Sequence, residues 1–235
     1  MATHELYDSR LSVIIPTINE AACIGATLKS IQTAGNVEVI VADGGSEDRT
    51  RVIAASFGAR VLVCQKGRAQ QMNYGASFAN GAILLFLHGD TLLPDGFDIN
   101  LRQLLLKPGI AAGSFRLRIA SRRFGFRLLE ALINFRSTVL QMPYGDQGLF
   151  LKAGTFQELG GFPQLPVMED FVFVRQLKKH GRIVISPSTV VTSARRWERL
   201  GIVKATIVNQ VIITAFHLGV NPSRLAVWYY QTQGH

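Results

Sequence analysis

The sequence has little cysteine and no long apolar run. Its two cysteines, Cys23 and Cys64, lack CxxC or Cys/His spacing, so we expect neither a disulfide framework nor a cysteine metal site. The opening stretch MATHELYDSR is polar, which predicts no secretion signal and a reducing cytosol as the location. The most apolar stretch, 202–218, carries too many polar residues to be expected to cross a membrane.

Acidic residues are also scarce: 16 stand against 25 lysines and arginines, which gives a formal net charge of +9. The arginines concentrate in two stretches, 114–136 and 175–199. No nucleic-acid module is recognisable and aromatic residues do not alternate with these basic runs, so we expect no nucleic-acid partner. An anionic small molecule or a membrane surface suits this charge better.

An acidic residue follows each of three short apolar runs. Glu20 follows LSVIIPTIN, Asp43 follows VEVIVA, and Asp90 closes ILLFLHGD. Short continuous runs of Val, Ile and Leu predict buried parallel strands. The carboxyl ends of such strands meet at one crevice, so these carboxylates indicate a site for a phosphorylated, metal-bound ligand.

The pattern predicts an α/β protein that begins βαβαβαβ and forms one domain. We expect strands at 11–16, 37–42, 59–64 and 83–87, and helices at 19–33, after Ser46, and at 67–80. Asn19 and Ser46 are the expected helix N-caps. Alternation at 115–119 predicts a strand with one wet face, where a mixed edge of the sheet begins. Further helices are expected at 122–141, 169–180 and 201–219.

Two C-terminal segments have amphipathic patterns. The helix around 124–136 divides into an apolar face, Phe124, Leu128, Ala131, Leu132 and Phe135, and a polar face, Arg123, Arg127, Glu130 and Asn134. This is a basic amphipathic helix. The segment 202–218 fits a core or dimer helix, and it also fits an interfacial helix that brings the protein to a lipid acceptor.

Several linked motifs carry a resemblance that spacing alone does not supply. In order they are SVIIPTINEAACIGATLKSI, VEVIVADGGSEDRT, GRAQQMNYGASFANGAILLFLHGDTLLP, LGGFP and MEDFVFVRQLKKHG. Up to about residue 186 the chain resembles the family 2 glycosyltransferases, and it is most similar to a compact bacterial single-domain branch, some of whose members are named for arsenosugar biosynthesis.

The resemblance implies the GT-A fold, a Rossmann-like α/β fold with a mostly parallel central sheet and helices on both faces. It implies one domain over 1–235, with a nucleotide-sugar half at about 1–95, an acceptor-side half at about 96–200 and a C-terminal helical extension at about 201–235. The implied activity is transfer of a sugar from a UDP- or GDP-linked donor to an acceptor hydroxyl, with inversion at the anomeric carbon.

The resemblance also assigns a metal site and a donor site. Asp90 closes the family's DxD motif and is the expected ligand of Mn²⁺ or Mg²⁺, which would stabilise the departing diphosphate. His88 stands where the first carboxylate of that motif is expected. The other donor contacts implied are Pro16, Thr17 and Glu20 in the first loop, Asp43 at the nucleobase, and Arg68 near the base or diphosphate.

On the acceptor side the resemblance makes Asp170 the general base, with Glu169 orienting its neighbours. Asp146 and Gln147 are the expected acceptor contacts, and Arg196 with Trp197 partly matches an element that closes over the donor. Three of the residues assigned by the resemblance also fit an ordinary structural role. Asp43 fits a tight turn, Asp170 fits an acidic first helical turn, and Arg196 fits a surface basic cluster.

Three classes of function follow from these residues. The favoured one is the glycosyltransferase, which would act on a small-molecule or lipid-linked acceptor, in the cytoplasm or at the inner membrane face, as a monomer or a homodimer. The alternative is a non-catalytic sugar-nucleotide-binding or membrane-surface scaffold on the same fold. A sugar-phosphate nucleotidyltransferase would need a Gly-rich basic loop after the first strand, and PTINEA is not such a loop.

Overall fold

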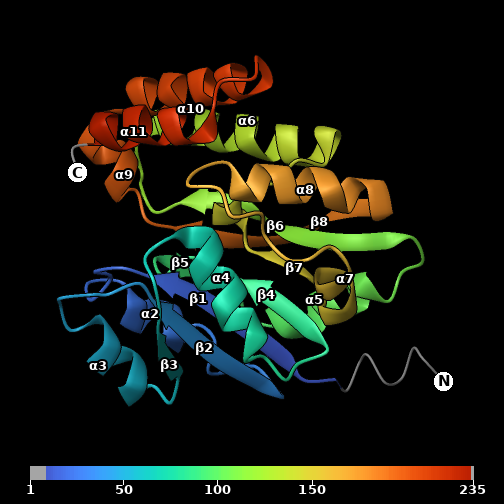
Figure 1. Cartoon of the computed structure of the whole chain (residues 1–235). Coiled ribbons are helices and arrows are strands. Elements are labelled where there is room, and N and C mark those ends of the chain that lie inside the picture. Colours follow the sequence, from blue (N-terminus) through green and yellow to red (C-terminus); the bar gives the residue numbers. More distant parts are fainter. Residues whose placement is uncertain (1–8, 234–235) are drawn as a thin grey trace.

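A mixed sheet forms the centre of the protein (Figure 1), which is described here from a computed structural model covering residues 9–233. Within that range the sheet has eight strands in the order β3-β2-β1-β4-β7-β6-β8-β5. Most of the polar opening segment, where no secretion signal is expected, lies outside the described residues.

The first half of the sheet is parallel, as predicted. It contains β1 (Leu11–Thr17), β2 (Val37–Asp43), β3 (Arg60–Val63) and β4 (Ile83–Phe86). The central strands β1 and β4 are buried along almost their whole length, because helices cover both faces of a parallel sheet. The continuous runs of Val, Ile and Leu therefore predicted these strands to within a residue or two.

The second half of the sheet is largely antiparallel. It contains β5 (Thr91–Leu92), β6 (Ile110–Ile119), β7 (Leu149–Lys152) and β8 (Arg182–Thr192). β7 joins β4 and β6 in antiparallel pairs, β6 and β8 are parallel, and β5 pairs antiparallel with β8. β6 as a whole lies between β7 and β8, but β7 pairs only with Ala112 and Gly113, so 115–119 pairs with β8 alone and has one open side, as the expected sheet edge implies. Its wet face is confirmed, since Arg116 and Arg118 are exposed.

Helices cover both faces of the sheet, and each layer has its own core, which confirms the predicted fold class. One core packs α2 (Ile24–Lys29), α5 (Phe97–Leu105) and α6 (Phe124–Leu140) on one face. The other packs α4 (Arg68–Ser77), α7 (Ala153–Glu158) and α8 (Glu169–His180) on the opposite face.

The first two helices begin later than predicted. α2 begins at Ile24 and α3 (Thr50–Ser56) at Thr50, so neither Asn19 nor Ser46 is an N-cap. Instead the two predicted caps bind each other's loops: the Asn19 N–H donates to Ser46 Oγ at 2.9 Å, and the Glu47 N–H donates to Asn19 Oδ1 at 2.9 Å. These bonds satisfy backbone N–H groups of the two loops that precede the helices.

Three helices follow β8: α9 (Arg195–Leu200), α10 (Ile202–His217) and α11 (Pro222–Gln233). They lie beside α6 above the sheet (Figure 1). The predicted helices at 122–141, 169–180 and 201–219 correspond to α6, α8 and α10. In the described residues, none of the helices combines the length and apolar character that a membrane span requires.

Helix α6 is inverted relative to an ordinary surface helix. Its polar face packs on β6: Asn134 accepts from the Leu117 N–H at 2.8 Å and donates to the Leu117 carbonyl at 2.9 Å. Glu130 accepts from the Ile119 N–H at 2.6 Å. The apolar face points outward, where Phe124 is 84% exposed. The predicted amphipathic pattern is present, but Glu130 and Asn134 of its polar face pack against β6 while Arg123 stays exposed.

Candidate functional site

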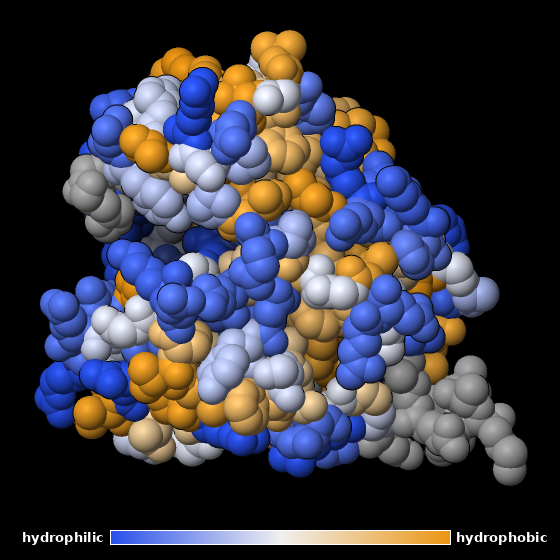
Figure 2. All heavy atoms as spheres, viewed as in Figure 1, coloured by the Kyte–Doolittle hydropathy of each residue, from blue (hydrophilic) through white to orange (hydrophobic). Residues whose placement is uncertain are grey.

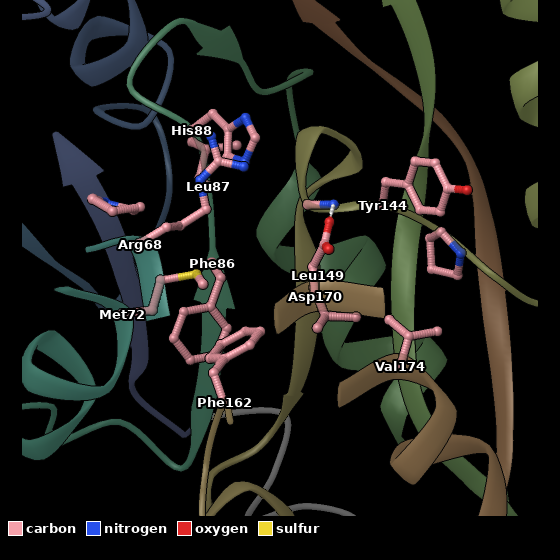
Figure 3. Close-up of a pocket in the computed structure, with 13 residues that line it drawn as sticks. Arg68, Met72, Phe86, Leu87, His88, Tyr144, Leu149, Phe162, Asp170 and Val174 are labelled. Carbon is pink, nitrogen blue, oxygen red and sulfur yellow. Dashed lines mark hydrogen bonds between the residues drawn. The ribbon is translucent and has the colours of Figure 1, made fainter. Parts of the chain in front are cut away.

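A cavity of about 380 Å³ lies at the carboxyl ends of β1 and β4, between the parallel half of the sheet and the helices α6, α10 and α11. It is visible as the hollow on the left of the space-filling view (Figure 2). A narrower pocket adjoins it, where Arg68 and His88 lie on one side and Asp170 and Tyr144 on the other (Figure 3). Most of the predicted site residues meet here.

Four predicted donor contacts line the cavity. Pro16 and Glu20 come from the loop after β1, Arg68 begins α4, and His88 follows β4. Burial, with the nearby charges of Arg68 and Arg196, lowers the pKa of His88 well below its ordinary value. His88 is therefore neutral near pH 7, and its imidazole can donate one hydrogen bond and accept another.

Asp43 and Thr17 lie beneath the cavity and do not line it. The fully buried Asp43 carboxylate accepts from the N–H groups of Gly45 at 3.1 Å and Ser46 at 2.8 Å. Its other oxygen accepts from Ser46 Oγ at 2.5 Å and Thr17 Oγ1 at 3.2 Å. These four bonds use the acceptor positions of the carboxylate, so in this structure Asp43 holds the turn after β2, and a nucleobase would have to displace one of its partners.

The guanidinium of Arg195 contacts two carboxylates, those of Glu20 and Asp90. Arg195 Nη2 lies 2.5 Å from Glu20 Oε2 and 3.3 Å from Asp90 Oδ2. Glu20 is partly buried, and this burial raises its pKa despite the bond from Arg195. Arg195 therefore offsets part of the negative charge of the carboxylates that follow β1 and β4.

Asp170 is held rigidly at the start of α8. Its Oδ2 accepts from the Gly145 N–H at 2.9 Å (Figure 3), and its Oδ1 accepts from the Phe171 N–H at 2.7 Å. A Cβ on Gly145 would lie 3.4 Å from Asp170 Oδ2 and 3.1 Å from His88 Nε2. A side chain at position 145 would therefore require the His88 ring to shift slightly, while its contact with Asp170 would be an ordinary one.

Glu169 is buried beside Asp170, and its surroundings raise its pKa. Burial, with the neighbouring Asp170 charge, raises the pKa of Glu169 to about 7. Glu169 forms a long ion pair, with its Oε1 3.8 Å from Arg68 Nε. The two adjacent acids thus differ: backbone donors fix the position of Asp170, whereas Glu169 ionises only near neutral pH.

Of the two predicted acceptor contacts, Asp146 and Gln147, only Asp146 lines the cavity. Asp146 lines the cavity together with Arg136 and Tyr144. Gln147 is fully buried and does not: its Nε2 donates to the Phe115 carbonyl at 3.0 Å, and its Oε1 accepts from Ser137 Oγ at 2.7 Å. The expected acceptor contact of Gln147 is wrong for this structure, because its amide is used to join β6 to α6.

Arg196 and Trp197 both line the cavity. They also connect α9 to α10, α11 and α6. Arg196 Nη2 donates to Asn209 Oδ1 at 2.7 Å, and its guanidinium lies 5.3 Å from the centre of the Tyr229 ring. Trp197 is buried, with its ring edge-on to Phe126. Closure of this pair over a donor remains a prediction.

Comparison with known proteins places the chain in a family. Residues 12–157, more than half of the chain, match the family described as "Glycosyl transferase family 2". The chain belongs to glycosyl transferase family 2. The matched segment runs from β1 into α7 and includes His88, Asp90 and Asp146.

Solved GT-A structures confirm the fold. The mannosyltransferase PcManGT from Pyrobaculum calidifontis, in complex with GDP-Man and Mn²⁺, has a TM-score of 0.65 at 22% identity and covers 97% of this chain and 74% of its own. S. aureus TarS in complex with UDP has a TM-score of 0.65 at 18% identity, covering 78% of this chain and 60% of its own.

Curated relatives match over a shorter segment. A "PGL/p-HBAD biosynthesis glycosyltransferase" of Mycobacterium tuberculosis is 41% identical over 91 residues, which is 35% of this chain and 36% of the relative. "Glycosyltransferase AglE" of Haloferax volcanii is 37% identical over 91 residues, 34% of this chain and 30% of the relative. The match therefore spans about a third of the length of these family 2 proteins.

The family 2 site fits a divalent cation only in part. No group of three or more His, Cys, Asp or Glu side chains that could hold a metal occurs among the described residues. Asp90 lines the cavity with its carboxylate partly exposed. Magnesium-type ions are often held by one or two carboxylates and substrate phosphates, so Asp90 suits an ion that a diphosphate helps to hold.

Three residues of this site were not predicted from the sequence: Arg195, Arg136 and Tyr144. Arg195 belonged to a recognised basic cluster, but nothing in its spacing indicated that it reaches the ends of β1 and β4. Arg136 and Tyr144, whose cation–π distance is 3.4 Å, come from α6 and the loop after it. A basic residue among apolar neighbours on the buried side of α6 was the one available signal for Arg136.

Proposed function

We propose that the protein is an inverting glycosyltransferase in which Asp170 is the general base. The observation that carries the proposal is the fixed Asp170 carboxylate, which faces the same cavity as the donor-side residues His88 and Asp90. A base with a fixed orientation next to a bound donor is the arrangement that single displacement requires.

In the proposed reaction the acceptor hydroxyl transfers its proton to Asp170 as its oxygen attacks the anomeric carbon. The bond from that carbon to the donor's phosphate oxygen breaks, and the nucleoside diphosphate leaves with the electron pair. Attack from the side opposite the leaving group inverts the anomeric configuration. Neutral His88 and the Arg68 guanidinium, which both line the cavity, can hydrogen-bond the sugar and the diphosphate.

For the donor we propose a UDP- or GDP-linked sugar. The support is the family and the two similar folds, one in complex with UDP and the other with GDP-Man. A divalent cation, Mn²⁺ or Mg²⁺, would be held by Asp90 together with the donor's phosphate oxygens. When bound it would stabilise negative charge on the departing diphosphate.

Ligand-dependent stability tests the donor assignment. We would measure the melting temperature with UDP, GDP and their sugars, each with Mn²⁺, Mg²⁺ or a chelator, because a ligand that binds the native state raises it. We expect one nucleotide to stabilise the protein. Asp170→Asn should retain this stabilisation while transfer falls by about 10²–10⁴-fold, as expected for loss of a general base.

The matched control is Asp95→Asn, which changes an acid away from the cavity lining. Stabilisation by a nucleotide without any transfer or donor hydrolysis would favour the non-catalytic scaffold. Full activity of Asp170→Asn would remove Asp170 as the base.

We also propose that the outward face of α6 and α10 rests on an anionic lipid surface. The exposed apolar residues are Phe124, Leu128, Leu132, Phe135 and Val139 on α6 and Val203, Ile207 and Val211 on α10. Hydrophobic residues gather along the upper rim in Figure 2, where Figure 1 shows these helices. Exposed Arg122, Arg123 and Lys204 adjoin them, as in helices that bind anionic interfaces.

The inverted packing of α6 supports this proposal. The polar face makes hydrogen bonds to β6, so the apolar face cannot turn inward without breaking them. Vesicle flotation tests the idea. The protein should float with phosphatidylglycerol vesicles, Phe124→Ser/Leu128→Ser should not, and Val52→Ser, an exposed apolar site on α3, should behave as the parent. A concentration-dependent homodimer that the double variant abolishes, without flotation, would replace the membrane with a second copy.

A further inference from the structure

Three buried side-chain atoms in the cavity region have no hydrogen-bond partner within residues 9–233. They are Nε and Nη2 of Arg136 and Oδ1 of Asp146. Both residues line the cavity that also contains Asp170. Buried polar atoms in native proteins nearly always have a partner, so an exception calls for an explanation. Two donors and one acceptor at the same cavity match a ligand that both accepts and donates hydrogen bonds.

The Arg136 guanidinium is oriented by its surroundings. Its central carbon lies 3.4 Å from the centre of the Tyr144 ring. This stacking fixes the plane of the guanidinium and leaves the Nε and Nη2 edge for another group. Two parallel N–H donors on one edge can bind a pair of oxygens in a defined orientation.

The acidic neighbours decide which oxygens suit this edge. Asp146, Glu169 and Asp170 line the same cavity as Arg68, Arg136 and Arg196, and an anionic group placed directly beside Asp146 would be repelled by that carboxylate. A neutral hydroxyl meets no such repulsion. It can accept a hydrogen bond from Arg136 and donate its own proton to Asp146 Oδ1.

The subsite adjoins the base through consecutive residues. Asp146 follows Gly145, whose N–H donates to Asp170 Oδ2 at 2.9 Å. A hydroxyl bound by Asp146 is therefore close to the carboxylate that would deprotonate the reacting hydroxyl. One group of the acceptor can be recognised while its neighbour reacts.

Beyond this polar end, part of the cavity wall is apolar, although α10 also contributes the polar side chains of Thr206, Asn209 and Gln210. Leu129 and Ile133 line it from α6, on the same helical stripe as Arg136, and Ile212 and Ile213 line it from α10. These side chains provide no hydrogen-bonding groups for a fully hydroxylated ligand. They suit an apolar chain or ring attached to the hydroxylated group.

We infer that Arg136 and Asp146 form the head-group subsite for an amphipathic acceptor, which carries at least one hydroxyl beside the reacting one and an apolar tail along Leu129, Ile133 and Ile212. This inference rests on the proposed glycosyl transfer for the role of the bound molecule. Arg136 and Asp146 are then the residues that select the acceptor.

Binding of short amphiphiles tests the subsite. The probes are hexyl β-glucoside, with a neutral hydroxylated head, hexyl sulfate, with an anionic head, and hexanol, each titrated by calorimetry into protein saturated with UDP or GDP. Hexyl glucoside should bind most tightly. Arg136→Lys and Asp146→Asn should each weaken it about tenfold or more, as for loss of a hydrogen bond to a charged group. Nucleotide affinity should change less than about twofold, because neither substitution alters a residue proposed to hold the nucleotide.

Arg118→Lys, an exposed arginine on β6 outside the cavity, is the matched control and should bind hexyl glucoside as the parent does. Equal binding of the glucoside to the parent and both cavity variants would overturn the subsite, as would tighter binding of hexyl sulfate. If neither UDP nor GDP binds the parent, the proposed function fails instead, because the subsite test is read only on the nucleotide-bound protein.

Discussion

Two adjacent acids at the start of α8 have been given opposite roles by their surroundings. Asp170 accepts two backbone N–H bonds, while Glu169 is buried with a distant cation. Burial, with the Asp170 charge, raises the pKa of Glu169 to about 7 from 4.5. Two carboxylic acids in the same helical turn therefore differ: Asp170 is fixed in place by backbone donors, and Glu169 is half protonated near neutral pH.

The raised pKa of Glu169 has a consequence for stability. The pKa of Glu169 is higher in the native state than in the unfolded state. Its contribution to the free energy of unfolding is therefore fully present below the unfolded-state pKa and is lost as pH rises through the native-state pKa. Glu169→Gln should therefore raise the free energy of unfolding by about 1–3 kcal/mol at pH 8, with little effect at pH 4. Urea denaturation at both pH values measures this. Exposed Glu198→Gln is the control, and a pH-independent difference would contradict the assignment.

Arg195 is a second residue whose effect can be isolated. Its guanidinium contacts Asp90, the residue proposed to hold a divalent cation. Arg195→Gln should strengthen Mn²⁺ binding in the absence of nucleotide by about tenfold, equivalent to about 1.4 kcal/mol, because a competing cation is removed. Titration followed by electron paramagnetic resonance measures free Mn²⁺. Exposed Arg199→Gln should not change the affinity, and an unchanged Arg195→Gln would mean that the guanidinium does not compete.

At the scale of elements, α6 performs three tasks on three stripes of one helix. Asn134 and Glu130 satisfy the backbone of β6, the stripe containing Leu129, Ile133 and Arg136 lines the cavity, and the stripe beginning at Phe124 faces outward. A side-chain amide that pairs with a strand backbone replaces part of a missing neighbouring strand.

This docking makes Asn134 important for stability. Asn134→Ala would leave the N–H and carbonyl of Leu117 without their partner, which should lower the free energy of unfolding by about 1–3 kcal/mol. Chemical denaturation measures the loss. Thr138→Ala, at an exposed position of the same helix, should cost much less. Equal effects of the two substitutions would show that the amide pair contributes nothing specific.

The sequence predicted elements well where local pattern decides them. The Val, Ile and Leu runs of β1 and β4 and the periodic α8 were found because burial imposes those patterns directly. The starts of α2 and α3 were wrong because Asn19 and Ser46 bind each other's loops across 27 positions. Such a long-range bond leaves no local signal.

At the scale of the whole molecule, the site joins segments from both ends of the chain. Pro16, Asp90 and Asp170 were predicted because they match family motifs, and the structure brings them to one cavity. The wall contributed by Ile212 and Tyr229 could not be predicted, since neither residue carries a motif. Its position depends on how α10 and α11 pack above the sheet.

The net charge of +9 is also a property of the whole molecule. If the outward face binds anionic lipid, binding should weaken with salt, because the Debye length falls from about 8 Å at 0.15 M to about 3 Å at 1 M. Flotation with phosphatidylglycerol vesicles over this range measures the effect, and phosphatidylcholine vesicles provide the uncharged comparison. Binding that is independent of both salt and lipid charge would contradict an electrostatic contribution.

The short turn Gly145–Gln147 has a consequence for how acceptor preference can evolve. Its three successive residues orient Asp170, line the cavity and join β6 to α6. Inserting or deleting one residue would move all three at once. Descendants of this sequence can therefore change acceptor by substitution at Asp146 or Arg136, whereas changes in the length of this turn would disrupt the chemistry before a new specificity could be selected.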